Sequence, residues 1–453
     1  MEEMTLQQAL NLAAEKHKKG KLEEAEFIYK KILEKNPRNP DAIHLLGLVA
    51  YQRGKHEEAI NLIKKAIEIN KNATYYGNLG MVYDAINEDE KSEEAFETAL
   101  SIDSEHTNAY LAHYNLGIFL KDRGEFEGAL EHYEKAIKLN PNFPEAHWNM
   151  GLILLMLGKF EEGWKECIYR FKKQNPSDSR AFGKPQWNGE SLEGKKILIA
   201  SEQGFGDSMQ FIRYLPFVKE KKGYIILECK KELEKLFGNI KEVDKIITKE
   251  KDNALDKDFD YYIHLMDLPR IFRTNLKNIP NKVPYIKADQ NLSKKFRQEF
   301  KTGKFNIGIA WAGNPEQDND KNRSTVFDKF KVLKEVSGIV LFSLQKGKQE
   351  EQLDDSQIIN LSNKMNDFSD TAALIENLDL IISVDTSVAH LAGAMGKPVW
   401  TLLTLHPDWR WLLDRNDTPW YPTMRLFRQK KKGDWDSLLS EVKKELEDYL
   451  KNN

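Results

Sequence analysis

The first 176 residues carry a pattern of hydrophobic positions that recurs about every 34 residues and predicts two helices in each period. The clearest copy runs from Asn115 to Pro141, and Gly158 and Phe160 repeat two of its positions 34 residues later. Small residues that let paired helices approach alternate in it with large ones that fill the space between them. These positions are Leu116, Gly117, Gly124, Phe126, Ala129, Tyr133 and Ala136.

Three earlier segments share the same small and large positions. They are marked by Leu46, Gly47, Gly54, Ala59 and Ala66, by Leu79, Gly80, Phe96 and Ala99, and, in a degenerate first copy, by Gly20, Ala25 and Pro37. The spacing resembles that of tetratricopeptide repeats, which implies an α-solenoid of about five repeats over residues 1–178. Arrays of this kind bind peptides or proteins in a concave groove.

Asparagine directly precedes the Leu-Gly-type pair in four of the five copies, at Asn11, Asn78, Asn115 and Asn149. A side-chain amide offers a donor and an acceptor, so a ladder of amides is suited to pair with the backbone of an extended polypeptide. The O-linked N-acetylglucosamine transferases of eukaryotes, which this organisation resembles, hold protein acceptors in that way. The alternative is that each asparagine bonds a neighbouring helix.

Beyond Pro176 the helical period stops, and a linker with Gly183, Pro185 and Gly189 leads to a series of short apolar runs separated by helical stretches. The predicted strands are 196–200, 224–227, 245–248, 261–264, 305–310, 339–343, 378–383 and 398–402. This alternation predicts doubly wound parallel sheets. A charged segment at 280–304 divides the strands, so we expect two Rossmann-like α/β lobes, at 185–290 and 303–453, with a cleft at the carboxyl ends of their strands.

The first predicted strand is followed by a turn with Gly204 and Gly206, and Asp207 stands at the start of the next helix. The stretch from Gly204 to Pro216 resembles the opening of heptosyltransferase-like glycosyltransferases, a GT-B family whose aspartate lies in the acceptor cleft. The resemblance implies that Asp207 acts as general base on an acceptor hydroxyl and that the glycines border the donor. The alternative is that Asp207 only caps the helix.

A second motif, from Ser383 to Pro398, also follows a predicted strand and opens a helix. It resembles the signature of the same family, in which an aspartate and a hydroxyl residue precede a histidine by one helical turn. The resemblance implies that Asp385, Thr386, Ser387 and His390 bind the donor diphosphate, with a hydrogen bond or a positive charge from the histidine. The alternative is a histidine satisfied in the core, with Asp385 as a cap at the strand end.

Two further loops supply candidate contacts to donor phosphate. Asn314 and Arg323 follow the strand 305–310, and Arg323 matches the basic residue of the family best, although Lys321 competes for that role. Gln345 and Lys346 follow the strand 339–343 and resemble a phosphate-contacting loop of the O-linked N-acetylglucosamine transferases. Because GT-B enzymes generally use no metal, such cations would balance the charge of the leaving group. We therefore expect no metal and no cofactor besides the nucleoside-diphosphate sugar, which is a substrate.

Two acidic pairs, Asp318 with Asp320 and Asp434 with Asp436, imitate the metal-binding Asp-x-Asp of the other large glycosyltransferase fold. Neither pair ends a predicted strand, so we interpret both as solvated loops. The segments 406–415 and 418–422 concentrate aromatic residues and resemble a stretch typical of the repeat-linked members of the family. Their rings are suited either to hold a base or sugar or to close the C-terminal lobe.

The bulk composition excludes several classes of partner. With 31% charged residues and a net charge of −3, no global field attracts nucleic acid or an anionic membrane surface. The acidic start lacks a secretory leader, and no apolar run is long enough to span a membrane. Cys167 and Cys229 lie far apart, which favours buried thiols over a disulfide or a zinc site. We therefore expect a cytoplasmic protein.

These motifs imply an inverting, metal-independent glycosyltransferase that moves a sugar from a nucleoside-diphosphate donor to an acceptor hydroxyl, with the repeats recruiting a protein acceptor. Two alternatives stay open. One is a heptosyltransferase acting on a lipopolysaccharide-type glycan, with the repeats used for assembly. The other is a non-catalytic adaptor that keeps the lobes as a protein-binding surface. The motifs do not specify the nucleotide or the sugar.

Overall fold

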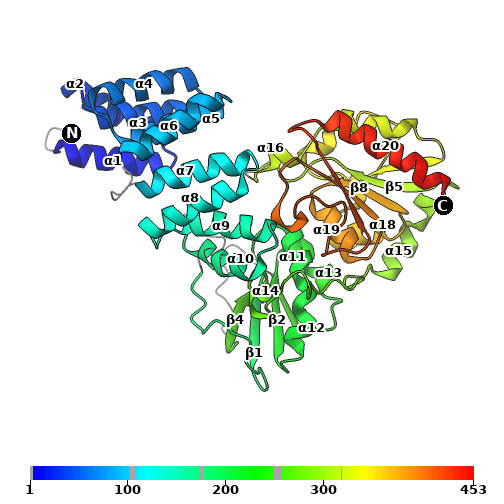
Figure 1. Cartoon of the computed structure of the whole chain (residues 1–453). Coiled ribbons are helices and arrows are strands. Elements are labelled where there is room, and N and C mark those ends of the chain that lie inside the picture. The colour runs from blue at the N-terminus through cyan, green and yellow to red at the C-terminus, as the bar shows by residue number, and fades with distance from the viewer. Residues whose placement is uncertain are drawn as a thin grey trace. The chain divides into compact units, whose positions relative to one another are not determined.

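A computed structural model describes residues 4–102, 109–173, 178, 180–248, 258–317 and 319–452 of the chain (Figure 1). The acidic residues 1–3, Pro176 of the predicted linker and Asp318 of the first acidic pair lie outside the described residues. The chain divides into two compact units, Met1–Met150 and Gly151–Asn453. No helix in the described ranges is long and apolar enough to cross a membrane.

The N-terminal region consists of helices in consecutive pairs, as the 34-residue period predicts (Figure 1). In chain order they are α1 (Leu6–Lys18), α2 (Leu22–Lys35), α3 (Pro40–Gln52), α4 (His56–Ile69), α5 (Ala73–Ala85), α6 (Asp89–Ile102), α7 (Ala109–Asp122), α8 (Phe126–Leu139), α9 (Pro144–Met156) and α10 (Phe160–Glu166). The predicted α-solenoid is confirmed.

Glycine ends the first helix of four pairs because the backbone there is left-handed. The φ angles are +71° at Gly20, +74° at Gly54, +82° at Gly124 and +77° at Gly158. In the third pair, the equivalent turn uses Asn87 at a φ of 59°. Only glycine and, less readily, asparagine adopt this conformation without a large steric cost. The turn chemistry therefore sets the period of the repeats.

The small residues of the pattern sit where paired helices touch. A Cβ atom built on Gly117 would lie 2.6 Å from the ring of Tyr133, and one built on Gly80 would lie 2.8 Å from the ring of Phe96. Both rings come from the second helix of the same pair and are buried. The alternation of small and large positions is therefore a packing requirement.

The second unit contains two sheets, and every described pair of neighbouring strands is parallel. The first has the order β3 (Lys245–Thr248), β2 (Tyr224–Cys229), β1 (Lys196–Ala200), β4 (Tyr261–His264). The second has the order β10 (Met424–Arg428), β9 (Val399–Leu403), β8 (Leu380–Val384), β5 (Phe305–Ala310), β6 (Ile339–Ser343), β7 (Ile359–Asn360). The prediction of helical repeats followed by a parallel-sheet α/β region is confirmed.

Short helices connect these strands. They are α11 (Phe205–Phe211), α12 (Leu215–Lys219), α13 (Glu234–Phe237), α14 (Leu268–Ile271), α15 (Gln290–Phe296), α16 (Asp320–Arg323), α17 (Phe327–Phe330), α18 (Phe368–Ile375), α19 (Ser387–Ala394) and the longer α20 (Trp435–Lys451). In the second sheet, β8 lies between β9 and β5. The loops that follow β5 and β8 therefore emerge side by side at the same edge.

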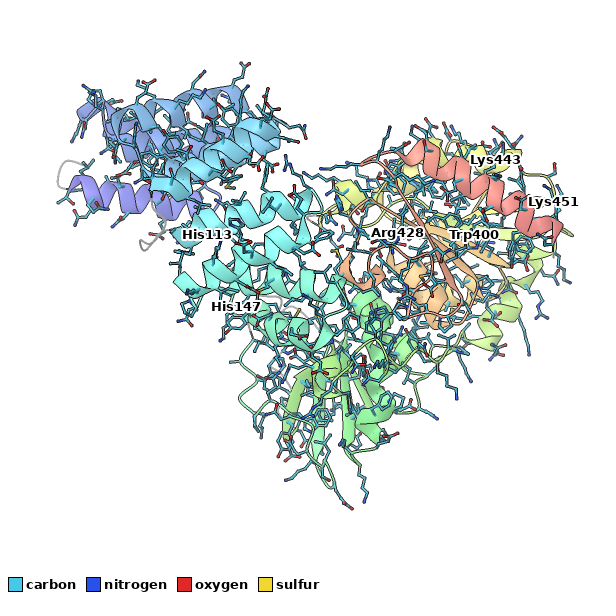
Figure 2. All side chains as sticks on the ribbon, viewed as in Figure 1. His113, His147, Trp400, Arg428, Lys443 and Lys451 are labelled. Atoms are coloured by element: carbon cyan, nitrogen blue, oxygen red, sulfur yellow. The ribbon has the colours of Figure 1, made fainter. Side chains whose placement is uncertain are left out.

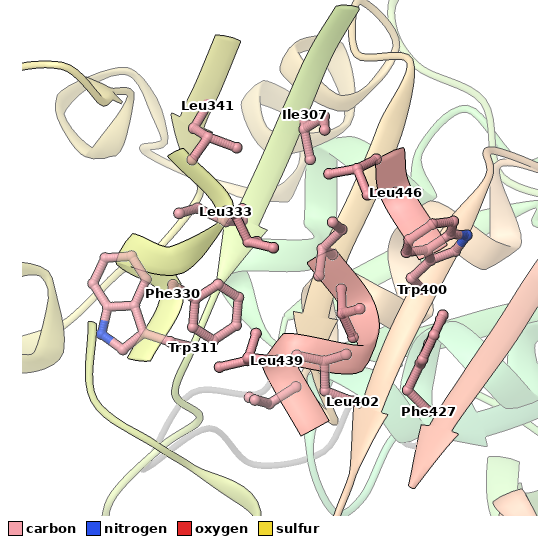
Figure 3. Close-up of a cluster of buried hydrophobic side chains, with 14 of the residues drawn as sticks. Ile307, Trp311, Phe330, Leu333, Leu341, Trp400, Leu402, Phe427, Leu439 and Leu446 are labelled. Atoms are coloured by element: carbon pink, nitrogen blue, oxygen red, sulfur yellow. The ribbon is translucent and has the colours of Figure 1, made fainter. Parts of the chain in front are cut away.

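A hydrophobic core of this unit lies on one face of the six-stranded sheet (Figure 3). Leu439 and Leu446 of α20 pack there with Ile307 of β5 and with Trp400 and Leu402 of β9. The apolar side chains of α20 recur at helical spacing, which is why this helix covers the sheet. The core fixes the strands whose carboxyl ends carry the second motif.

Candidate active site

The loops after β1 and β8 bring the starts of α11 and α19 into contact. A Cβ atom built on Gly206 would lie 2.6 Å from Cδ2 of His390 and 3.3 Å from its Nε2. Any larger residue at position 206 would push the two helices apart. The two motifs found in the sequence therefore meet at one place, and the glycine of the first is explained by the histidine of the second.

Both oxygens of Asp207 are engaged. Oδ2 accepts a hydrogen bond from the N–H of Gly204 at 2.9 Å, and Oδ1 accepts one from Nη2 of Arg410 at 2.5 Å. The carboxylate thus caps the first turn of α11 and also forms an ion pair with a buried arginine. Its capping role is observed, and its role as a general base stays a prediction.

Arg410 connects several polar groups near Asp207. Its Nε donates to Oε1 of Gln210 at 2.6 Å, and its Nη1 lies 2.7 Å from Oδ1 of Asp408. Burial opposes its charge, but the carboxylates of Asp408, Asp207 and Asp385 outweigh burial and raise the pKa of Arg410. Burial also raises the pKa of Asp408, to about 6, although Arg410 counteracts the shift. The sequence did not single out Arg410 as a site residue.

Asp385 and His390 are fixed by aromatic residues from the segment after β9. Oδ2 of Asp385 accepts a hydrogen bond from Nε1 of Trp411 at 2.9 Å, and Nδ1 of His390 lies 2.8 Å from the hydroxyl of Tyr421. The ring of His390 stacks on Trp411, with the ring centres 5.3 Å apart. The aromatic segment therefore closes the C-terminal lobe directly behind the second motif.

His390 is neutral at pH 7. Burial lowers its pKa well below 6.5, and the charges of Arg410, Arg213 and Arg323 lower it further. The expectation of a positive charge from His390 is therefore wrong, because the three arginines already supply the cations around it. Oδ1 of the neighbouring Asp385 lies 3.7 Å from Nε2 of the His390 ring.

The first turn of α19 has no side-chain cap from the residue that precedes it. That residue is Thr386, and its side chain makes no capping hydrogen bond to the N–H groups that follow. The hydroxyl of Thr386 instead lies 2.9 Å from that of Ser383. Ser387 is half-buried at the first helical position. Uncapped N–H groups at a helix start favour an anion, so the expected diphosphate contacts are compatible with this geometry.

Arg323 lies at the same edge of the sheet. A Cβ atom built on Gly313 would lie 2.8 Å from Nη2 of Arg323, so the guanidinium covers that glycine. Its Nε donates to Oδ1 of Asp320 at 3.3 Å, and Nη2 donates to Oε1 of Gln317. Nε2 of Gln317 lies 3.5 Å from the Cβ position of Gly204. The loop after β5 therefore reaches the start of α11.

The other predicted donor contacts have structural partners. The buried Gln345 accepts N–H groups of residues 311 and 312 with Oε1 and donates to the carbonyls of Ala312 and Lys346 with Nε2. It braces two loops, and no polar atom of its side chain is left for a ligand. Lys346 is exposed and donates to the carbonyl of Ser362 at 2.7 Å, while Oδ1 of the exposed Asn314 accepts from the N–H of residue 316.

The acidic residues that imitate a metal motif have other partners. Asp320 is 5% exposed and accepts from Ser324, so its assignment to a solvated loop is wrong. Asp434 caps α20 through the N–H of residue 437, and Asp436 pairs with Lys329. Within the ranges that the structure describes, no group of three His, Cys, Asp or Glu side chains could hold a metal ion.

A buried ion pair anchors the loop before α11. Arg170, which follows α10 and is 1% exposed, donates from Nε to Oε2 of Glu202 at 3.0 Å. Its Nη2 also lies 2.8 Å from Oδ1 of Asp267. Glu202 belongs to the turn that leads to Asp207, so a residue at the end of the helical region positions that turn.

In the first unit, three of the four predicted asparagines bond to neighbouring side chains. Their partners are Gln7 for Asn11 at 3.0 Å, His44 for Asn78 at 2.8 Å and Tyr114 for Asn149 at 3.2 Å. The alternative drawn from the sequence, a bond to a neighbouring helix, therefore holds for Asn78 and Asn149, while Asn11 bonds within its own helix.

Asn115 differs from the other three. Its side chain has no hydrogen-bond partner in the part of the chain that the structure describes, and its Nδ2 lies 3.8 Å from the Cβ position of Gly77. A cavity of about 210 Å³ lies at this place between α5 and α7. It is lined by Ala73, Thr74, Gly77, Asn78, Met81, Leu111, Ala112, Tyr114 and Asn115. The lining is mostly apolar, with amides from two consecutive repeats.

Buried histidines accompany the asparagines in the repeats. Burial lowers the pKa of His44 to about 4 and that of His113 to about 4. His113 lies on α7 (Figure 2). Its Nδ1 lies 2.9 Å from Nδ1 of His132, and the charge of a protonated His132 would oppose that of His113. These rings are therefore neutral in the folded protein at pH 7.

Comparison with known proteins finds similarities for both parts of the chain. The profile of glycosyltransferase family 9 (heptosyltransferase) matches residues 278–432. Tetratricopeptide and TPR repeat profiles match residues 73–106 and 119–158, and the profile of anaphase-promoting complex, cyclosome, subunit 3 matches residues 18–78.

Individual relatives match different shares of the chain. Protein FlbA of Caulobacter vibrioides is 26% identical over 448 residues, which cover 91% of this chain and 74% of that protein. Anaphase-promoting complex subunit 3 of Schizosaccharomyces pombe is 29% identical over 117 residues, which cover 26% of this chain and 17% of that protein. The crystal structure of MamA covers 35% of this chain and 91% of its own, at 29% identity and a TM-score of 0.28.

Proposed function

We propose, from the combination of tetratricopeptide repeats with a glycosyltransferase family 9 domain in one chain, that the protein is an inverting, metal-independent glycosyltransferase. Its donor would be a nucleoside-diphosphate sugar, and its acceptor a hydroxyl on a protein held by the repeats. The main support for the proposal is the contact of Gly206 with His390, which sets a carboxylate beside the uncapped start of α19.

In the proposed reaction, the diphosphate binds at the first turn of α19, at Thr386 and Ser387, where free N–H groups favour an anion. The guanidinium groups of Arg323 and Arg410 balance the charge that the leaving nucleotide gains. Asp207 accepts the proton of the acceptor hydroxyl, whose oxygen forms a bond to the sugar carbon as the bond from that carbon to the diphosphate breaks. One displacement of this kind inverts the configuration at the sugar carbon.

The proposed acceptor site is the cavity between α5 and α7. An extended polypeptide would place apolar side chains in the cavity and pair its backbone with the free amide of Asn115. Asn78 and Asn149 already bond to neighbouring side chains, so the proposal depends on Asn115 more than on a ladder of four. The reaction would take place in the cytoplasm, where the two free cysteines persist as thiols.

The donor half of the proposal is tested with a panel of nucleotide sugars. Binding of the correct donor should raise the melting temperature of the chain by mass action. Release of the nucleoside diphosphate is then followed for the wild type and for Asp207→Asn, with Asp417→Asn as a matched control that breaks an exposed aspartate–arginine pair. We expect a large loss of turnover in Asp207→Asn alone. Equal turnover refutes the base assignment, and no binding of any nucleotide favours the adaptor.

The acceptor half is tested with a panel of labelled, unstructured peptides. Asn115→Ala should weaken the binding of those peptides that bind the wild type, because it removes the free amide of the cavity. Asn11→Ala is the control, since Asn11 is exposed and does not line the cavity. If both variants bind like the wild type, Asn115 does not hold the acceptor and the alternative of a glycan acceptor, with the repeats used for assembly, is favoured.

A further inference from the structure

Both oxygens of the carboxylate proposed as general base accept a hydrogen bond in the free protein. Oδ1 of Asp207 is held by Arg410 at 2.5 Å and Oδ2 by the N–H of Gly204 at 2.9 Å. The side chains of Asp207 and Arg410 are 22% and 9% exposed, so water screens the pair only weakly. The guanidinium of Arg410 therefore occupies Oδ1, the oxygen of Asp207 that is not used to cap α11.

Arg410 lies on a backbone that is held on both sides. Trp409 packs edge-on against Trp164 of α10, with ring centres 5.2 Å apart, and Trp411 donates a hydrogen bond to Asp385. Both tryptophans are buried, at 3% and 0% exposed. The backbone at position 410 is thus anchored to α10 on one side and to the start of the second motif on the other, and the long side chain between them is the part that can change partners.

The guanidinium also lies close to the proposed donor site. Its charge lowers the pKa of His390, which sits one turn inside α19. The other two arginines whose charges act on His390 have other hydrogen-bond partners. Arg213 donates to the carbonyls of Pro280 and Trp420 and to the hydroxyl of Tyr285, and these bonds join the two lobes. Arg410 is the one of the three that is paired with the proposed base.

We propose that Arg410 is a switch: it neutralises Asp207 in the free protein and turns to the donor diphosphate when the donor binds. Oδ1 of Asp207 then becomes free to accept the proton of the acceptor hydroxyl, while the N–H of Gly204 keeps Oδ2 in place. The exchange is favourable because a guanidinium forms paired, charge-assisted hydrogen bonds to phosphate oxygens, and a diphosphate carries more charge than a carboxylate. The proposal rests on the glycosyl transfer proposed above.

The proposed exchange predicts that two anions compete for Arg410. Asp207 and a diphosphate compete for the same guanidinium, so removing the carboxylate should tighten diphosphate binding, and only as long as Arg410 is present. We propose to measure the affinity of inorganic diphosphate for the full chain by calorimetry, in the wild type, Asp207→Asn, Arg410→Gln and the double variant. Asp417→Asn again serves as the control for the loss of one negative charge.

We expect Asp207→Asn to bind diphosphate about fivefold to tenfold more tightly and Arg410→Gln to bind it about tenfold more weakly. In the Arg410→Gln background, the effect of Asp207→Asn should fall below about twofold, because the two groups act as one unit. Asp207→Asn leaves Arg410 paired with Asp408, so this variant keeps the test valid even if Arg410→Gln does not fold.

Two outcomes overturn the proposal and are distinguishable. In the first, the wild type binds diphosphate, but Asp207→Asn does not raise the affinity, or raises it equally with and without Arg410→Gln. Arg410 then does not move from Asp207 to the diphosphate, and the proposed transferase stands. If the wild type binds neither inorganic diphosphate nor any nucleoside diphosphate, the proposed donor site fails together with the switch.

Discussion

Gly206→Ala is the substitution that most directly tests the contact between the two motifs. The new methyl group would lie 2.6 Å from Cδ2 of His390 and 3.3 Å from its Cγ. Carbon atoms pack best at about 3.5–4.0 Å, so the overlap is about 1 Å. Either α11 moves away from α19, or the imidazole turns and loses its contact with the hydroxyl of Tyr421 at 2.8 Å.

The cost of this overlap follows from the packing of the interior. Overfilling a close-packed site costs about 1–3 kcal/mol. For a unit of about 300 residues, with an unfolding entropy of about 2.1 cal/mol/K per residue, this corresponds to a fall in melting temperature of about 2–5 °C. Because the two helices carry the proposed base and the proposed donor site, donor affinity should fall as well.

Thermal unfolding of the full chain and nucleotide-sugar binding measure both effects. Gly128→Ala is the matched control, since its new methyl group would meet only the flexible end of Leu120, at 3.2 Å. A double variant with His390→Asn should recover part of the melting temperature, because the clash is with the imidazole ring. If Gly206→Ala melts and binds donor like the wild type, α11 and α19 are not in contact at Gly206 and the two motifs do not form one site.

Three further substitutions test other parts of the structure. Arg170→Met removes the guanidinium that pairs with the buried carboxylates of Glu202 and Asp267 and should cost about 3–5 kcal/mol in urea unfolding, whereas a cost below about 1 kcal/mol would contradict the buried network. His44→Gln removes a ring whose pKa is about 4 in the folded protein and about 6.5 in the unfolded chain. Since the unfolded chain binds the proton first, the wild type should lose about 2 kcal/mol more stability than the variant between pH 7 and pH 5. Equal losses in the two proteins would mean that this ring is solvated. Trp411→Phe keeps the stacking but removes the N–H that holds Asp385, and should cost about 1–3 kcal/mol and weaken nucleotide-sugar binding in the thermal-shift panel; unchanged binding would separate Asp385 from the donor site.

Most of the fold could be predicted because it is encoded in local patterns. The helix pairs follow from the 34-residue period, and eight strands follow from apolar runs next to turn residues. Two strands were missed for physical reasons. β7 has only two residues, too few to form an apolar run. β10 is an outer strand, and its half-buried arginines, Arg425 and Arg428, interrupt the apolar run.

The site was predictable where a motif stands directly after a strand, and less so where a partner comes from elsewhere in the chain. Asp207 and His390 belong to such motifs. Arg410, Trp411 and Arg170 do not, because their roles depend on contacts between segments far apart in the sequence. The Trp-Arg-Trp sequence in the aromatic segment was the available signal, and its rings did turn out to be buried behind the second motif.

The aromatic segment also explains why the end of the helical region and the two lobes form one compact unit. Phe160 occupies a position of the repeat that is equivalent to Phe126 one period earlier. Its ring nevertheless packs on that of Trp420, with the ring centres 6.1 Å apart. Trp164 packs on Trp409 in the same cluster, next to Arg410. A disturbance at α10 therefore has a short path, through one pair of rings, to the arginine that holds the proposed base. The last helix of the repeats thus contacts the segment that carries Arg410, the partner of the proposed base.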